Sequence, residues 1–332
     1  AQNPQDSEQL SMSEQVGQAG RSPASMLPLL QLWRARHRAS PEVTRNAIDA
    51  LIQNRRLHPA TRGYARVLQA RAALEHGDVE AAASATEALG YVTQWNIVGP
   101  FDNEGKAGFA RAFDVEEDLV SPPDSTASFE GRERAVSWYA YDHRSPFGYV
   151  NFDASMRPDT HVCAYAQTVI HSDRARPLSL WVGAGGAVRV WWNGEQVLVD
   201  ERYRRPDPER STAMVGAHRG ANRLTVKVCV AQSIWGFFLR VGDPAGQPVD
   251  GVSVDPRDMT TPPTGHSRVR RPPAPITPLL ALTEAADEDG ASAEDLENLA
   301  RFLSYTGADD PAEHLALQLA ERAATTAPTV DR

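Results

Sequence analysis

The chain has 332 residues, of which 41% are hydrophobic, enough for two or three domains with buried cores. Its net charge of −9 offers no broad basic surface for a phosphate backbone, so we expect no nucleic-acid partner. The longest strongly apolar stretch, residues 178–192, contains three glycines and Arg189 and is shorter than the roughly 18 residues of a membrane span.

The first twenty residues begin with Ala1 rather than Met and are polar to about Gln18. Such an end is typical of an exported protein after removal of its signal peptide, although a trimmed chain would begin in the same way. Of the 34 cationic residues, 32 are arginines, which is typical of a GC-rich bacterial genome. We therefore expect a bacterial protein of the periplasm, outer surface or secreted fraction, with residues 1–20 disordered or extended.

Residues 21–90 carry the apolar spacing of helices. Ser22-Pro23 and Ser40-Pro41 each place a capping residue before a proline in the first helical turn. Two further helices are predicted over 59–75 and 79–89. Small residues in this last pair, Ala70, Ala73 and Ala81 among them, indicate the close helical hairpin of a tetratricopeptide-like repeat.

Residues 91–250 hold 20 of the 24 aromatic residues, together with β-branched runs separated by turn residues. Asn193-Gly194 supplies the two positive φ angles of a type I′ turn and predicts a hairpin over 187–199. Alternation in that hairpin places Val188 and Val190 on one face and Trp191 on the other. We predict an antiparallel β-sandwich here.

The segment 251–278 contains seven prolines, whose fixed φ angles and missing amide donors exclude helix and central strand. We interpret it as an extended linker, or alternatively as a basic proline-rich ligand for a grooved partner. Residues 279–332 repeat the helical hairpin pattern around Leu296–Tyr305 and Pro311–Ala323. The predicted fold class is thus α+β multidomain, with N-terminal helical hairpins, a central sandwich and a C-terminal tetratricopeptide-like hairpin.

Residues 190–194 (Val-Trp-Trp-Asn-Gly), followed by 220–224 and a valine-rich strand, resemble the galactose-binding-like jelly roll of sugar-binding domains. Residues 95–103 resemble the opening of such a domain in large bacterial exported proteins. Those proteins combine tetratricopeptide repeats with, in some members, a downstream transglutaminase-like domain. The catalytic cysteine, histidine and aspartate of that domain have no match here, so the resemblance implies architecture and no enzymatic role.

Three groups of residues are candidates for a site. Trp191 with Arg189 could stack and bind a sugar, aided by the loop residues Arg202, Arg204 and Arg205, unless the tryptophan lies under a helix or another domain. The oxygen donors of Asp102, Asn103 and Glu104 suit a structural calcium ion, although turn chemistry accounts for them equally well. The two cysteines, Cys163 and Cys229, form a disulfide bond only if the fold brings their strands together.

The remaining motifs give no catalytic signature, because the nine histidines have no metal-type spacing and no nucleophile elbow occurs. We therefore expect no cofactor apart from that calcium ion. The predicted function is a non-catalytic scaffold or recognition region that contacts other proteins. The alternatives are a carbohydrate-binding module that takes a glycan, and an accessory region of a larger transglutaminase-like or other enzyme.

Overall fold

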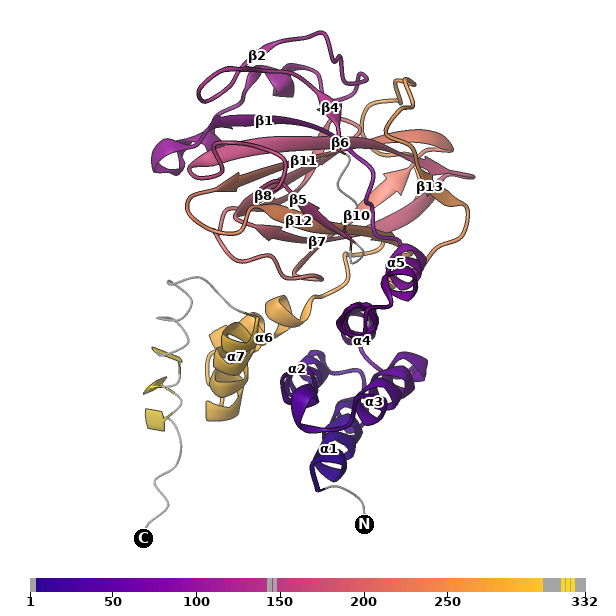
Figure 1. The fold of residues 1–332 in the computed structure, drawn as a ribbon, viewed down its shortest axis with the longest axis vertical. Coiled ribbons are helices and arrows are strands. Elements are labelled where there is room, and N and C mark those ends of the chain that lie inside the picture. The colour runs from indigo at the N-terminus through magenta and orange to yellow at the C-terminus, as the bar shows by residue number, and fades with distance from the viewer. Residues whose placement is uncertain are drawn as a thin grey trace. The chain divides into compact units, whose positions relative to one another are not determined.

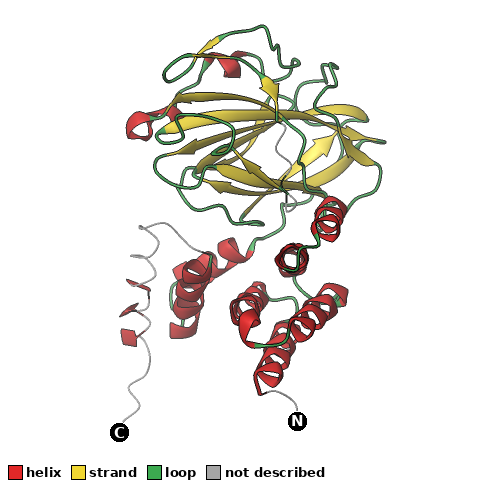
Figure 2. Ribbon diagram, in the orientation of Figure 1, coloured by secondary structure: helices red, strands yellow, loops and turns green. Residues whose placement is uncertain are grey.

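The computed structural model describes residues 4–141, 145, 148–306, 318–319, 321–322 and 324–325. It divides into two compact units, and the second interrupts the first in sequence. A helical unit comprises Ala1–Ala85 and Ile276–Arg332, and a β-sandwich unit comprises Thr86–Pro275. Figure 1 shows the course of the chain, and Figure 2 shows which segments are helices and which are strands. Among the described residues, no helix is both long and apolar enough to cross a membrane.

The predicted N-terminal helices are present. They are the α-helices α1 (Pro4–Ala19), α2 (Met26–Ala35), α3 (Pro41–Gln53), α4 (Pro59–Glu75) and α5 (Val79–Ala88), with the 3-10 turns η1 (Pro23–Ser25) and η2 (Arg36–Arg38). Ser22 caps the first turn by accepting from the Ala24 amide, as its position before Pro23 predicts. In the predicted close hairpin, however, Ala81 is exposed and its neighbour Ala82 is buried.

The first helix corrects the expectation that residues 1–20 are disordered or extended. Although α1 is polar, Val16 and Gln9 are buried against the neighbouring helices α2 and α3. The Gln9 side chain also donates to the Leu32 carbonyl at 3.2 Å. Two buried anchors therefore order a segment that has no apolar stripe of its own, because tertiary packing overrides composition.

The C-terminal helices α6 (Pro278–Asp287) and α7 (Ala293–Tyr305) belong to the helical unit. A capping box starts α7, because Ser292 and Asp295 bond to each other's backbone amides. Tyr305 at its end accepts from Gln31 at 3.3 Å and lies 5.0 Å from the Arg34 guanidinium. Helices from the N-terminal and C-terminal parts of the chain thus pack together in the helical unit. The second predicted helix of the C-terminal tetratricopeptide-like hairpin, 311–323, lies almost wholly outside the described residues, so that repeat is not shown.

The sandwich consists of two antiparallel sheets. The larger has the order β4-β1-β6-β11-β8-β9, with β13 also paired to β6, and the smaller has the order β10-β7-β12-β5. Their strands are β1 (Asn96–Asp102), β4 (Tyr139–Ala140), β5 (Tyr149–Asn151), β6 (Val162–Ser172), β7 (Arg176–Gly185), β8 (Ala187–Trp192), β9 (Glu195–Asp200), β10 (Ser211–Ala217), β11 (Gly220–Val230), β12 (Gly236–Gly242) and β13 (Val252–Val254). The hairpin predicted at Asn193-Gly194 joins β8 to β9, and both turn residues have positive φ.

Alternation along the strands separates a central core from two outer faces. Val226 and Val228 of β11, with Val190 and Trp192 of β8, point into the core between the sheets. The intervening residues, such as Trp191, point away from it. The outer face of the larger sheet lies under residues 103–138, called here the cover segment, which includes η3 (Glu104–Phe109), η4 (Asp114–Glu117), β2 (Phe129–Glu130) and β3 (Ala135–Val136).

The proline-rich segment is extended, but it is not a free spacer. Residues 255–275, called here the strap, belong to the sandwich unit and bond along it. The Asp255 amide donates to the Val169 carbonyl, Gly265 to Asn193 and Ser267 to Gly216. Prolines leave the strap with few amide donors. The amides that remain donate to carbonyl groups of the sandwich that the strap passes.

Candidate functional site

The aromatic residue proposed for sugar stacking lies where alternation places it, on the outer face of the larger sheet. It is not accessible, however, because Trp191 is 6% exposed. It packs in an apolar layer between the larger sheet and the cover segment. The layer also contains Phe109 and Phe113 of the cover segment and Tyr165 of β6. The expectation of an exposed platform is therefore wrong. The tryptophan is covered, as the alternative held, but by a segment of the same unit rather than by another domain.

Arg189 lies beside Trp191, as expected, with its guanidinium 6.0 Å from the centre of the ring. Arg189 is partly buried and its guanidinium lies 4.9 Å from the Phe109 ring, so it packs against the cover segment. Arg202 is 63% exposed and pairs with Asp200 at 3.2 Å. Arg204 is partly buried, and its carbonyl accepts from the Gly186 amide. Arg205 is exposed. The loop therefore presents Arg202 and Arg205 to solvent, whereas the Trp191 ring is buried.

The three oxygen-bearing residues proposed for calcium do not converge on one point. Asn103 is fully buried, and its amide donates to the Val230 carbonyl at 2.9 Å and to the Tyr203 hydroxyl at 3.1 Å. Asp102 and Glu104 face Arg132, at 3.7 and 2.9 Å. The Arg132 guanidinium thus already balances both carboxylates, and the Asn103 amide is used in tertiary hydrogen bonds, so neither calcium nor local turn bonding accounts for these side chains. Within the described part of the chain, no group of three His, Cys, Asp or Glu side chains could hold a metal ion.

Cys163 and Cys229 are joined by a disulfide bond. They are direct partners in the antiparallel ladder of β6 and β11, with Cα atoms 4.0 Å apart, and both are fully buried under the cover segment. The bond links the two central strands of the larger sheet, 66 residues apart in sequence. Its position makes it a structural crosslink in the sheet rather than an exposed reactive pair.

A buried lysine lies beside this disulfide on the same face. Lys227 is fully buried, and its ammonium group donates to the Arg111 carbonyl at 2.6 Å and to the Glu116 carboxylate at 2.8 Å. The Tyr165 hydroxyl donates to the same carboxylate. Burial lowers the pKa of Lys227, an effect that Glu116 opposes, and burial together with Glu116 raises the pKa of Tyr165. The cluster fastens the cover segment to the sheet.

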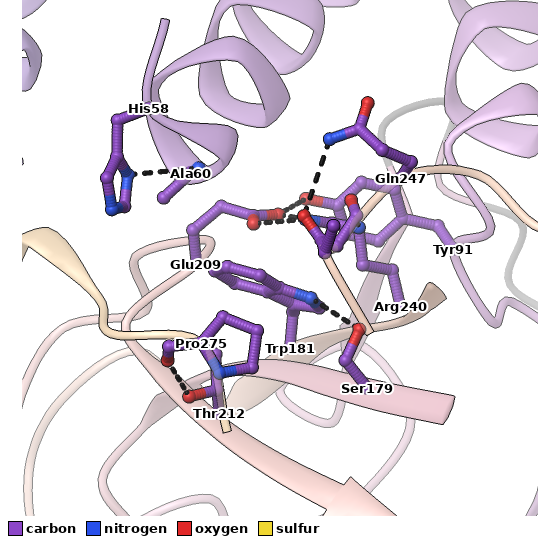
Figure 3. Close-up of polar contacts among 12 residues, drawn as sticks. His58, Ala60, Tyr91, Ser179, Trp181, Glu209, Thr212, Arg240, Gln247 and Pro275 are labelled. Atoms are coloured by element: carbon purple, nitrogen blue, oxygen red, sulfur yellow. Dashed lines mark hydrogen bonds and ion pairs between the residues drawn. The ribbon is translucent and has the colours of Figure 1, made fainter. Parts of the chain in front are cut away.

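The outer face of the smaller sheet holds a second buried ion pair (Figure 3). Arg240 of β12 donates through two nitrogens to the two carboxylate oxygens of Glu209, both at 2.5 Å, and each side chain is 1% exposed. The guanidinium also lies 4.7 Å from the Trp181 ring and donates to the Gly246 carbonyl at 2.8 Å. Burial disfavours its charge, but Glu209 outweighs that effect and raises the pKa of Arg240.

Neither ion pair was predicted from the sequence, although each leaves a signal. Arg240 lies between Leu239 and Val241 in a run that is otherwise apolar, and Lys227 is one of only two lysines and lies in a valine-rich strand. A charge inside an apolar strand requires a buried partner. The partners, Glu209 and Glu116, lie in irregular segments far away in sequence, where no local pattern identifies them.

No family model matches the chain, and no curated protein matches it. Among solved structures, it is similar to an anti-sigma factor domain-containing protein, with 14% identity over 29% of this chain and 34% of that one, at a TM-score of 0.25. A family 35 carbohydrate-binding module from Clostridium thermocellum has 13% identity over 44% of this chain and 98% of the module, with a TM-score of 0.23. A β-glucosidase from Kluyveromyces marxianus has 9% identity over 45% of this chain, with a TM-score of 0.30.

The matched region spans about a third of the anti-sigma factor protein and only 16% of the β-glucosidase. Identities and TM-scores at this level leave the ligand of the chain to be argued from its own residues.

Proposed function

We propose that the chain is a non-catalytic recognition region of an exported bacterial protein, in which a rigid galactose-binding-like sandwich presents its loops to protein partners. The observation that carries this proposal is the double cover of the sandwich. On the larger sheet, the Lys227–Glu116 pair and large apolar side chains hold the cover segment against the strands, and on the smaller sheet the Arg240–Glu209 pair holds the segment that carries Glu209. Rigid support of this kind is what a recognition surface needs.

The buried disulfide supports export. Disulfide bonds persist in oxidising compartments such as the periplasm and are rare in the reducing cytosol. Cys163 and Cys229 are opposite each other on adjacent strands and are both consumed by the bond. Isolation of the chain from the periplasmic or secreted fraction with this bond intact tests the proposal, and recovery in the cytosol with both thiols free would contradict it.

Protein recognition is tested by crosslinking the whole folded chain to the exported fraction of a bacterium that produces it. We expect a saturable partner that heat-unfolded chain does not capture. The unfolded chain is the matched control, since it has the same composition and charge. Equal capture by folded and unfolded chain would contradict a recognition surface that depends on the fold.

Carbohydrate binding is the second proposal, and the exposed loop residues Arg202 and Arg205 favour it. A polysaccharide array with the folded chain tests it, with Arg205→Ala as the variant that should weaken binding. Trp191→Phe is the control, because a buried ring touches no glycan. An accessory role beside a catalytic domain is the third proposal, and the sequence of the full-length gene product tests it.

A further inference from the structure

The C-terminal part of the strap is exposed although it is fixed to β10 at both ends. At the upstream end, the Ser267 amide donates to the Gly216 carbonyl at 3.0 Å. At the downstream end, the Thr212 hydroxyl donates to the Pro275 carbonyl at 2.6 Å. Between these two bonds, residues 270–274 are all exposed. The strap therefore presents a short stretch of chain to solvent with both of its ends held in place.

This stretch has two parts of different chemistry. The first part is cationic, because Arg268, Arg270 and Arg271 are all exposed. None of these three guanidinium groups forms a hydrogen bond or an ion pair with a described residue of the chain. The second part, residues 272–274, is Pro-Pro-Ala and is apolar. A partner therefore meets three unpaired positive charges followed directly by an exposed apolar surface.

The local conformation orders these side chains. The chain is extended, without a turn, over residues 270–275. Its prolines fix φ at values that favour the left-handed polyproline helix, which has about three residues per turn. Residues three positions apart then lie on the same edge of the segment. Arg270 thus shares one edge with Pro273, and Arg271 shares another with Ala274, and all four are exposed.

Other occupants fit this stretch less well than a protein groove. Anionic membrane surfaces are bound by clusters of about four to eight cations, and the stretch has three. The net charge of −9 also opposes the approach of the chain to a membrane, a nucleic acid or a second copy of itself. None of these occupants uses the prolines, whereas an aromatic-lined protein groove binds an extended proline-rich segment through them.

We propose that residues 268–274 are a linear recognition motif that docks in a groove of a partner protein, lined by aromatic side chains and with carboxylates at one end. The proposal rests on the recognition function and names its site. Pro273 and Ala274 contact the aromatic side chains, and the guanidinium groups of Arg270 and Arg271 bind the carboxylates. The prolines and the two bonds to β10 hold the motif in place before it binds, so docking costs little conformational entropy.

The first test is photo-crosslinking with the whole chain carrying Ala274→p-benzoylphenylalanine, in the exported fraction of a bacterium that produces the protein. We expect a partner whose crosslinked peptide contains aromatic residues. An excess of the peptide Arg-Val-Arg-Arg-Pro-Pro-Ala-Pro should prevent the crosslink, and Glu-Val-Glu-Glu-Pro-Pro-Ala-Pro should not. Equal inhibition by the two peptides, or inhibition by neither, would contradict the motif.

The second test measures the affinity of the purified partner for whole-chain variants by isothermal titration calorimetry. Arg270→Glu/Arg271→Glu should weaken binding about tenfold, because two ion pairs become repulsive. The matched control, Arg174→Glu/Arg219→Glu, makes the same change in net charge at exposed arginines elsewhere in the sandwich and should bind like the unchanged chain. A control variant as weak as the first would show that only the overall charge matters, and the motif would be wrong.

A third variant tests the contribution of the prolines. Pro272→Gly/Pro273→Gly should weaken binding about fivefold, since the unbound segment becomes more flexible and loses apolar contacts. Both residues are exposed, so thermal unfolding of this variant should match that of the unchanged chain. Unchanged affinity would mean that the prolines are not recognised.

Two further results separate this site from the recognition function. If the charge-reversed variant still binds the purified partner as tightly as the unchanged chain, the recognition function survives and the assignment to the strap fails. If no partner is captured by the folded chain at all, both fail. Sedimentation of the chain with vesicles of equimolar phosphatidylcholine and phosphatidylserine, lost in the charge-reversed variant, would assign the arginines to a lipid surface and overturn the proposal.

Discussion

The two outer faces of the sandwich are covered in opposite ways. On the larger sheet, big side chains such as Trp191, Tyr165 and Phe113 fill the space between the strands and the cover segment. On the smaller sheet, glycines bring backbone against backbone: a Cβ on Gly183 would collide with the Asp207 carbonyl, and one on Gly185 with that of Ile234. The stability of the cover on the larger sheet therefore depends on keeping its side-chain atoms. The cover on the smaller sheet is destabilised when atoms are added at its glycines.

The largest effect is expected at the ion pair of the smaller sheet. Arg240→Leu leaves Glu209 buried without a counter-charge, which should lower the free energy of unfolding by about 3–5 kcal/mol. The double variant Arg240→Leu/Glu209→Leu should recover much of that loss. Urea unfolding followed by tryptophan fluorescence measures both. A double variant as unstable as the single one would mean that packing, not charge, holds this face.

On the larger sheet, removal of the disulfide bond should cost less. Cys163→Ala/Cys229→Ala should lower the free energy of unfolding by about 2–4 kcal/mol, because the unfolded chain loses a constraint. Addition of dithiothreitol to the unfolding series should destabilise the unchanged chain and leave the variant unaffected. If the reductant weakens both equally, the bond is not the source of the difference.

A glycine-to-alanine substitution tests the backbone contact on the smaller sheet. Gly183→Ala should destabilise the sandwich by about 1–3 kcal/mol, since the added methyl group meets fixed backbone. Gly17→Ala in α1 is the control, because only the Asn54 side chain lies within van der Waals contact there, and it should gain about 0.5–1 kcal/mol. Thermal unfolding of both variants measures the signs, and a neutral Gly183→Ala would show that the loop can move aside.

The smallest effect concerns acid pH. Hydrogen bonds from Ser121 lower the pKa of Asp118 in the cover segment, and bonds from Thr260 lower that of Asp258 in the strap, both below the ordinary value of 3.8. The stability these carboxylates contribute is present above that value and lost as pH falls through their folded pKa values. Unfolding at pH 7 and pH 3 should therefore differ less in Asp118→Asn. An unchanged difference would assign the acid sensitivity elsewhere.

The elements that could be predicted from the sequence are those with local signals. Ser22 caps a helical turn and Ser40 precedes α3, although its side chain makes no capping hydrogen bond, and the turn at Asn193-Gly194 joins two strands. Alternation also identified the face on which Trp191 lies. Its burial was foreseen as an alternative, but the segment that covers it could not be predicted, because the cover segment has no periodicity that would reveal where it folds back.

The strap and α1 show the same limit. The prolines correctly indicated an extended segment after β13 and before α6, which begins at Pro278, but composition says nothing of which parts of the sandwich such a segment will follow. The polar composition of α1 likewise gave no sign that Gln9 would donate to the Leu32 carbonyl. Both depend on partners distant in sequence. The convergence expected for calcium and the exposure expected of Trp191 were wrong for the same reason.

The helical unit is assembled from the two ends of the chain, with Tyr305 contacting Gln31 and Arg34. The sandwich, residues 86–275, is therefore one uninterrupted stretch of gene and can be excised as a single fragment. The helical unit cannot, unless its two halves are spliced or supplied together. A single protease cut in a sandwich loop would therefore leave the two parts of the helical unit associated through their own contacts. The cut protein would run as one species in native electrophoresis and as two fragments after denaturation.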